Sequence, residues 1–470
     1  MKNVILTLFL ITGTLVAQEI EEKPLNDFTL EKKEIVRNQK VYENGFLYQC
    51  RWTWKPRSMR IVKINKESEI VASLDVSQYG SVIFRKDKII VFNNKDFDGG
   101  FDYYSGLVDL NTLKFKTDFK KIAKVNEGES YKWTVVENSK NIAVIVRTNY
   151  SDKVNEQLIL LDSNGDFIKE ENYTYNVNNF TRNERWKLNG EDYLLTEDGI
   201  VFELITKHNG SKKPRNYFIR KVGTDGVFKL NAPDGAYKLK WLQNETNDNA
   251  MIVGINTAPK VYTVSCEDEK RCPAEGILLS KFNPNDYKST KLNVKDIPQF
   301  MNSNVMDFRN IMFLKTNEIV MVFHGGSVEE YQRGPVTTIC LDPNLEIKWI
   351  SKGPSYASTS TRNRTYLGIA GCLSFEKEGF VHFLYNRPIA IRKYNAFDAQ
   401  QNMIYPIKNN MELVAGKTKV STGKYTEKAI FTYKKMEALI KPNEGTELMK
   451  GVYRFDTFKK KKYGFLTISF

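Results

Sequence analysis

The sequence repeats one short pattern eight times: a run of alternating apolar residues stops at Asp, Asn or Gly, and a second run follows. Neighbouring break points lie 44 to 61 residues apart. They are Asn65, Asp109, Asp162, Gly223, Asn283, Asp342, Asn395 and Asp456. Alternation is typical of half-buried strands, and Asp, Asn and Gly favour the turns between them. A unit this small cannot bury both faces of its sheet alone, so the units must stack on one another.

Each unit divides further into four short apolar runs, most clearly at 133–139, 141–149, 155–162 and 167–173. Four-stranded units with a period near 56 residues predict an all-β fold, a single closed β-propeller over residues 36–470. Eight units fill this range, so we expect eight blades. Seven is the alternative, if the region after Met411 closes or caps the ring. Residues 18–35 form an N-terminal extension or a ring-closing segment.

The first 17 residues have the composition of an export leader. Lys2 precedes an apolar stretch from Val4 to Val16, and Ala17 is a small residue suited to a cleavage site. We therefore predict a secretory signal peptide at 1–17 and a secreted or periplasmic protein, with an uncleaved anchor as the alternative. No later segment reaches the length of apolar residues that spans a bilayer. The LVAQ ending is similar to that of exported Bacteroidota proteins.

The chain carries a formal net charge of +14. Such an excess favours anionic partners such as acidic glycans, lipopolysaccharide or nucleic acid, and for an exported protein we favour the first two. The alternative is that the charge serves solubility. Part of it is local, because Lys459–Lys462 are four consecutive lysines in the expected turn of the last hairpin.

Loop length predicts where a ligand binds. The turns between third and fourth strands look short, whereas the connections between second and third strands look long, and the latter emerge on one face of the propeller. Loops held on a rigid scaffold commonly carry function. Basic residues there position an anionic ligand, and aromatic residues offer a stacking surface. The predicted binding residues are Trp54, Arg57, Lys212, Lys213, Arg215, Tyr331, Arg333 and Arg387.

One segment, NKDFDGGFD, has the oxygen spacing of a calcium loop. Its candidate ligands are Asn94, Asp96, Asp98 and Asp102, with Gly99 available for the sharp turn. It resembles the calcium cage of integrin-type propeller repeats, although Asn replaces Asp at the first position and no other unit repeats the motif. The alternative is a hairpin loop rich in Asp and Gly for turn chemistry alone.

Cysteine and histidine offer little catalytic chemistry. Cys266 and Cys272 lie in one segment and predict a disulfide in an exported chain. Cys340 and Cys372 are expected to be buried thiols, although neighbouring blades leave a bond between them open. His324 and His382 are expected to be buried imidazoles, and Trp52 is expected to pack between blades.

Two functions of different classes fit these observations. The first is a non-catalytic binding or scaffold propeller that recognises an anionic glycan or an envelope protein. The second is a polysaccharide hydrolase or lyase, which needs converging carboxylates or a base paired with a cation. No phosphate loop, nucleophile elbow or H-E-x-x-H motif appears in the sequence.

Overall fold

In a computed structural model, the described residues lie mainly in β-strands. The structure describes residues 20–21, 34–42, 44–54, 57–65, 69–76, 81–85, 88–97, 100–116, 120–126, 130–150, 153–176, 192–207, 216–224, 226–233, 236–243, 250–257, 274–297, 306–326, 332–355, 357–358, 371–390, 411–433, 439–442, 445–449, 451–459 and 462–470. These residues form antiparallel sheets, which we number 1 to 8 in chain order.

The first four sheets each contain four consecutive strands. Sheet 1 has β2 (Glu34–Val41), β3 (Leu47–Trp54), β4 (Arg57–Ile64) and β5 (Ile70–Val76). Sheet 2 has β6 (Ser81–Phe84), β7 (Ile89–Phe97), β8 (Gly100–Val108) and β9 (Lys120–Asn126). Sheet 3 has β10 (Ser130–Glu137), β11 (Asn141–Tyr150), β12 (Lys153–Asp162) and β13 (Phe167–Asn176). Sheet 4 has β14 (Asp192–Leu195), β15 (Val201–Lys207), β16 (Asn216–Lys221) and β17 (Val227–Lys229).

Sheets 5 to 7 repeat this order. Sheet 5 has β18 (Ala236–Gln243), β19 (Ala250–Thr257), β20 (Ala274–Phe282) and β21 (Asn293–Asp296), with the 3-10 helix η3 (Pro284–Ser289) before its last strand. Sheet 6 has β22 (Met306–Phe313), β23 (Ile319–Gly326), β24 (Gln332–Leu341) and β25 (Ile347–Gly353), and β26 (Ala357–Ser358) also pairs with β24. Sheet 7 has β27 (Cys372–Lys377), β28 (Phe380–Pro388), β29 (Met411–Lys419) and β30 (Tyr425–Tyr433).

Sheet 8 joins the two ends of the chain. It contains β31 (Leu439–Ile440), β32 (Thr446–Met449), β33 (Val452–Lys459) and β34 (Lys462–Ser469), and its outer strand is β1 (Ile20–Glu21). Ile20 pairs with Ile468, and Glu21 with Thr467. A strand from the start of the chain therefore completes a sheet formed by its end.

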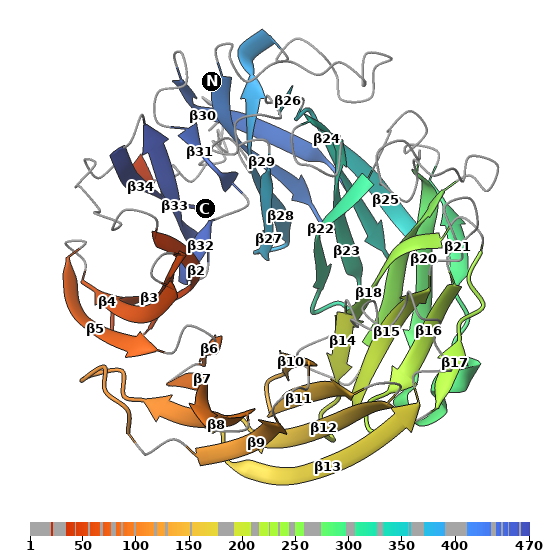
Figure 1. Cartoon of the computed structure of the whole chain (residues 1–470). Helices are drawn as coiled ribbons and strands as arrows, with labels where there is room; N and C mark the ends of the chain where they lie inside the picture. The colour runs from red at the N-terminus through yellow and green to blue at the C-terminus, as the bar shows by residue number, and fades with distance from the viewer. Residues whose placement is uncertain are drawn as a thin grey trace, which may run out of the picture.

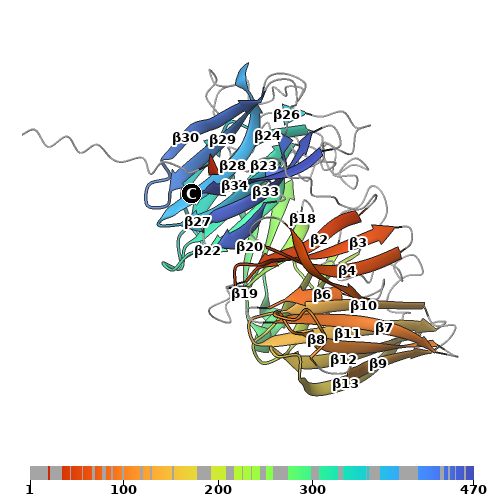
Figure 2. The ribbon, with the colours of Figure 1, turned by 90° about the vertical axis from the view of Figure 1, so that its left-hand side faces the viewer.

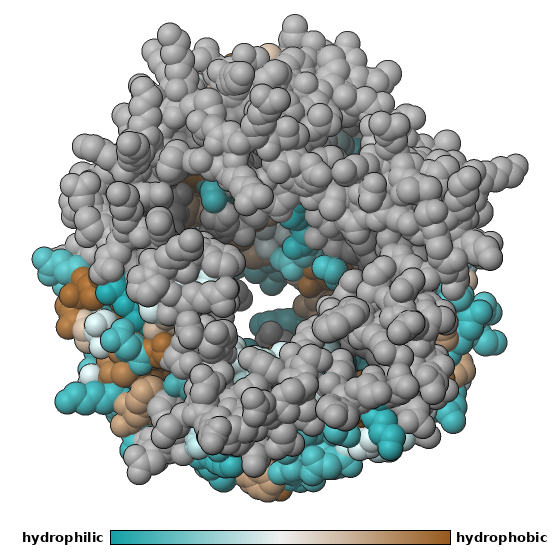
Figure 3. Space-filling model, viewed as in Figure 1, coloured by the Kyte–Doolittle hydropathy of each residue, from teal (hydrophilic) through white to brown (hydrophobic). Residues whose placement is uncertain are grey.

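The sheets follow one another around a central opening, with the first strand of each sheet innermost (Figure 1). The opening passes through the middle of the space-filling view (Figure 3). In the side view strands β2–β13 lie to the right of most of β22–β34, so the two groups are displaced from each other along the viewing direction of Figure 1 (Figure 2). Sheets placed side by side around an axis are the arrangement of a β-propeller, as the repeat predicts.

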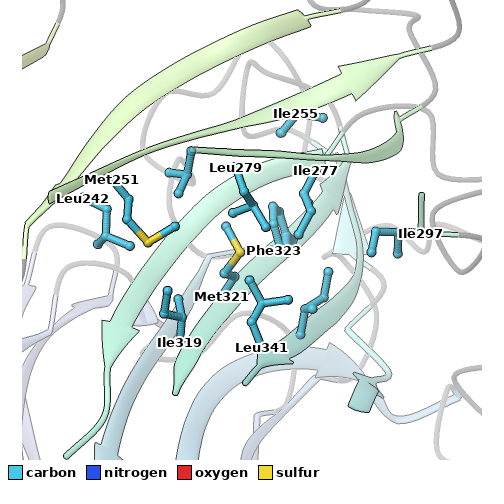
Figure 4. Packing of buried hydrophobic residues seen from close by; sticks show 12 residues of the cluster. Leu242, Met251, Ile255, Ile277, Leu279, Ile297, Ile319, Met321, Phe323 and Leu341 are labelled. Carbon is cyan, nitrogen blue, oxygen red and sulfur yellow. The ribbon is translucent and has the colours of Figure 1, made fainter. Parts of the chain in front are cut away.

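Alternation within the strands fills the space between sheets. In β11, Ile142, Val144 and Val146 pack against sheet 2, while Ala143 and Ile145 pack against sheet 4. The two faces of this inner strand therefore contribute to two different cores. Figure 4 shows one such core, between sheets 5 and 6, where Met251, Leu279 and Phe323 meet.

Six of the eight break points occupy the turn between the third and fourth strands, as expected. The Asp162 carboxylate explains the residue preference, because it accepts the backbone N–H groups of Asn164 at 2.7 Å and Asp166 at 2.9 Å. Asp109 and Asp342 bond their own turns in the same way. Gly165 follows with φ +83°, a conformation that L side chains rarely adopt.

The last two break points were assigned wrongly. Asn395 belongs to the connection between β28 and β29, outside the described residues, and the third-to-fourth turn of sheet 7 begins after Lys419. Asp456 lies within β33, where it pairs with Phe465, and is at no turn. In sheet 8 the N-terminus supplies the outer, fourth strand. Residues 439–469 therefore contain only the first three strands of that sheet and no third-to-fourth turn.

Candidate functional site

The two ends of the sheets differ in the length of their connections. In four consecutive antiparallel strands, second-to-third connections and sheet-to-sheet connections leave from one end, which we call the long-connection face. Segments 177–191, 258–273, 359–370 and 391–410 all leave from it, and all lie outside the described residues. The flanking strands fix where each of them begins and ends.

The expectation of long loops is wrong for sheets 2 and 3. Residues 93–105 form most of the β7–β8 hairpin, with only residues 98–99 between the strands. Likewise, β11 and β12 are joined by residues 151–152. Polar residues such as Asn94 and Asn155 suggested loops, but here they extend the paired strands.

Most predicted binding residues lie at or beside the long-connection face. Trp54 and Arg57 are paired at the ends of β3 and β4, and Arg333 lies in β24 beside Ala357. Their side chains lie outside the described residues, as do Tyr331 and the basic segment that contains Lys212, Lys213 and Arg215. Their role as ligand contacts stays a prediction.

Arg387 is a correction: it does not lie on an exposed loop. It belongs to β28, and only 3% of its surface is exposed. Its guanidinium donates to Glu412 at 2.7 Å and to Glu427 at 2.5 Å. Burial lowers the pKa of Arg387, but Tyr385 and the two carboxylates outweigh that effect and raise it, so the side chain is a charged member of the interior.

Around Arg387, sheet 7 holds a polar cluster that the sequence did not reveal. The Glu427 carboxylate accepts hydrogen bonds from Tyr385 Oη at 2.8 Å and Tyr425 Oη at 2.9 Å. The two hydroxyls are 2.7 Å apart. Burial, followed by nearby Glu427, raises the pKa of Tyr385 well above its usual value, so the phenol stays protonated. Such phenols serve as hydrogen-bond donors and not as nucleophiles at neutral pH.

A second buried cluster, which we call the four-charge ring, joins sheets 3 and 4. Arg147 and Glu156 are cross-strand neighbours in sheet 3, and Glu203 and Arg220 are cross-strand neighbours in sheet 4. Arg147 contacts both carboxylates, at 2.7 Å and 2.8 Å. Arg220 also contacts both, with 2.5 Å to Glu203. Positive and negative groups therefore alternate around a closed loop.

This ring is almost dry, with side-chain exposures between 0% and 8%. Burial raises the pKa of Glu156, but the attraction of Arg147 and Arg220 outweighs it and holds that pKa below its usual value. Gly223 also donates its backbone N–H to Glu156 at 2.8 Å. Two cations match two anions here, so the charges of the ring satisfy one another.

The sequence carries a signal for this ring, because charged residues occupy core positions of the strand alternation. Arg147 continues the buried positions Ala143 and Ile145 of β11, and Glu203 follows Val201 in β15. A charged residue at a core position of the alternation requires a partner. Alternation alone does not say which neighbouring sheet supplies it.

The calcium prediction is not tested by the described side chains. Asn94 and Asp96 lie in β7, but their side chains lie outside the described residues, as does all of Asp98. Asp102 pairs with Lys95 in the hairpin register, and its carboxylate contacts Lys121 at 2.7 Å. Among the described residues, no three His, Cys, Asp or Glu are grouped to hold a metal ion.

The cysteine and histidine predictions have mixed outcomes. Cys266 and Cys272 lie outside the described residues, whereas Cys340 and Cys372 are buried free thiols, as expected. His324 is buried and its Nε2 lies 3.3 Å from Ser355 Oγ. His382 stacks on Phe375, and burial, followed by nearby Lys417, lowers its pKa to about 4.

No protein-family model matches this sequence, and no curated protein sequence matches it. Several solved structures resemble this chain, with low TM-scores and low sequence identity. The β-propeller domain of the Trilobed protease from Pyrococcus furiosus has a TM-score of 0.38 at 10% identity, covering 85% of this chain and 98% of that one. The Pyrococcus horikoshii acylaminoacyl peptidase has 0.37 at 12% identity, covering 92% and 59%. A Synechocystis apocarotenoid oxygenase has 0.33 at 9% identity, covering 93% and 89%.

These similarities are too weak to assign a function. The function must be argued from the geometry of the chain itself. Within the described residues, no helix has the length and apolar composition that a bilayer crossing requires.

Proposed function

We propose that this chain is an exported, non-catalytic binding propeller: one closed ring of eight four-stranded blades that binds an anionic glycan or an envelope protein at its long-connection face. The signal peptide at 1–17 supplies export. The pairing of Ile20 and Glu21 with β34 supports closure by a segment that precedes sheet 1 in the sequence.

The observation that carries this proposal is that several basic segments of the sequence are connections at the long-connection face. Segment 208–215 joins β15 to β16 and contains Lys212, Lys213 and Arg215 but no acidic residue. Segment 359–370 contains two arginines and no acidic residue. Lys459 pairs with Lys462 at the β33–β34 turn, which is the second-to-third connection of sheet 8. All three therefore start and end at the long-connection face.

The interior charges favour binding over catalysis. In the four-charge ring each carboxylate forms ion pairs with two arginines. In sheet 7, Arg387 forms ion pairs with both Glu412 and Glu427. Carboxylates held by arginines are poor general acids. A hydrolase or lyase remains the alternative function, and chain shortening of a glycan by the purified protein would establish it.

Changing Lys212, Lys213 and Arg215 together to Ser is expected to weaken heparin binding by at least about tenfold, because several charges of a polyanion lose their contacts. Binding should also fall steeply with salt. Retention on a heparin column and titration at two salt concentrations measure both effects.

The matched control replaces three exposed lysines, Lys288, Lys315 and Lys424, by Ser at the opposite end of the sheets. That variant has the same net charge but keeps the long-connection face, so its binding should stay close to that of the parent. Equal losses in the two variants would show that net charge alone acts. Unchanged binding in both would favour the envelope-protein partner.

Calcium remains a separate proposal for the β7–β8 hairpin. If Asn94, Asp96, Asp98 and Asp102 bind calcium, millimolar calcium should raise the melting temperature, because a ligand of the folded state stabilises it. Asp98→Ala should abolish that rise and leave the calcium-free melting temperature unchanged. Identical calcium responses of parent and variant, or no response of the parent, would contradict the site.

A further inference from the structure

Three innermost strands contain a β-bulge, which is an extra residue that interrupts the pairing with the second strand of the same sheet. The bulges lie in β2, β18 and β22, whereas β6, β10, β14 and β27 pair with their second strands without a shift. The residues that the pairing skips are Arg37 in β2, Lys238 and Leu239 in β18, and Arg309 in β22. Each bulge therefore contains a basic residue.

All three bulges lie at the same height in their sheets. In sheets 1 and 6 the shift falls between the fourth and fifth residues of the second strand, counted from its first residue. In sheet 5, Lys238 and Leu239 lie opposite Gly254, the fifth residue of β19. We call this height the bulge level. Bulges change the direction of side chains and are common beside functional sites, so their recurrence at one level points to a shared role.

The bulge level surrounds the central opening. The innermost strands form the wall of this opening (Figure 1), and hydrophilic residues are visible on part of that wall in the space-filling view (Figure 3). Sheets 5 and 6 are neighbours that share an apolar core, and sheet 1 lies on the other side of the opening (Figure 1). Sheets 5 and 6 therefore bring two of the three bulges to one side of the opening.

Basic residues dominate the bulge level. Lys240 follows the bulge of β18 and its side chain is exposed, and Arg309 is half-buried. Among the described innermost strands of sheets 1 to 7, the one acidic residue at this level is Asp192, whose carboxylate accepts the backbone N–H of Trp241. Asp307 lies one pair beyond the bulge of β22, toward the long-connection face. The level thus has an excess of positive charge.

We propose that the bulge level binds a compact oxyanion of several negative charges in the central opening, with Lys238, Lys240 and Arg309 as its contacts. Arginine presents N–H groups in a fork that matches the oxygens of phosphate, sulfate or carboxylate groups, and lysine adds positive charge. A monovalent anion cannot balance cations from two sheets, so a multivalent anion is favoured. Residues on strands hold such contacts in place with little loss of entropy on binding. This site is separate from the long-connection face and does not depend on its function.

Pyrophosphate in calcium-free buffer at physiological salt is the probe, and isothermal titration calorimetry measures its affinity. The opening variant changes Lys238, Lys240 and Arg309 together to Ser. We expect it to bind pyrophosphate at least about tenfold more weakly than the parent protein, because it loses charge-assisted hydrogen bonds. The two triple variants described above, in segment 208–215 and at the opposite end of the sheets, remove the same charge elsewhere and should bind as the parent does. Absent binding by the parent, unchanged binding by the opening variant, or equal losses in all three variants would overturn the proposal.

A measurement on the parent protein keeps the test decisive if the opening variant does not fold. Acetylation of lysines by acetic anhydride, mapped by mass spectrometry, is compared with and without saturating pyrophosphate. Lys238 and Lys240 should react at least about fivefold more slowly when pyrophosphate is bound, because it covers and ion-pairs their ammonium groups. Lys212 and Lys213 should react at the same rate in both samples. Equal protection of the two lysine pairs, or no protection of Lys240, would contradict a site in the opening.

Discussion

Replacing Glu203 by Ala is expected to lower the free energy of unfolding by about 3–5 kcal/mol, because it leaves two buried arginines to share one carboxylate. Glu203 is fully buried, and it contacts Arg147 of the neighbouring sheet as well as Arg220 of its own. Urea unfolding followed by tryptophan fluorescence measures the change.

The matched control removes both members of the contact between the sheets. Arg147→Met combined with Glu203→Met leaves Glu156 and Arg220 as a balanced pair, so the double variant should be more stable than Glu203→Ala. The single variants Arg147→Met and Glu203→Met are measured as well. If the double variant loses as much free energy of unfolding as the two single variants together, the four charges do not act together. A loss below about 1 kcal/mol for Glu203→Ala would contradict the buried ring itself.

Phe323→Ala is expected to cost a similar amount, about 3–5 kcal/mol, for a different reason. Phe323 is fully buried between sheets 5 and 6 among Met251, Leu279 and Met321 (Figure 4). Truncation removes apolar burial and leaves a cavity that the rigid strands around it cannot fill.

Phe167→Ala is the control for this prediction. It removes the same type of side chain, but Phe167 is 43% exposed at the start of β13. That variant should change the free energy of unfolding by less than about 0.5 kcal/mol. Similar losses from the two truncations would mean that the core between sheets 5 and 6 is not packed as described.

The repeated alternation was sufficient to predict four-stranded units and six of their third-to-fourth turns. Six break points are third-to-fourth turns because an Asp, Asn or Gly at that position has a direct physical role, which the Asp162 hydrogen bonds display. Asn395 and Asp456 were misplaced because a similar local pattern also occurs in a connection and inside a strand. Local patterns cannot report that residues 20 and 468 pair, since that pairing is a property of the whole chain.

The residues of the candidate site were harder to predict from the sequence than the strands. Arg387 follows an apolar run and looks like the first residue of a loop, but β28 continues through it and Glu412 lies directly opposite. The four-charge ring needs residues from four strands, and one-dimensional alternation gives the face of each residue but not its neighbour in the next sheet. The basic segment 208–215 was found because its charges are adjacent in the sequence.

The pairing of β1 with β34 also bears on how the chain folds. Residues 20–21 must wait for residues 467–468 before this sheet is complete, so their pairing forms only after the whole intervening chain has been made. Contacts of such separation slow folding, because the whole intervening chain has to be ordered first. Until then the outer edge of β34 lacks its β1 partner, and an unpaired strand edge invites association with other chains. Folding yield should therefore depend on protein concentration more strongly than for a propeller whose blades are each complete in sequence.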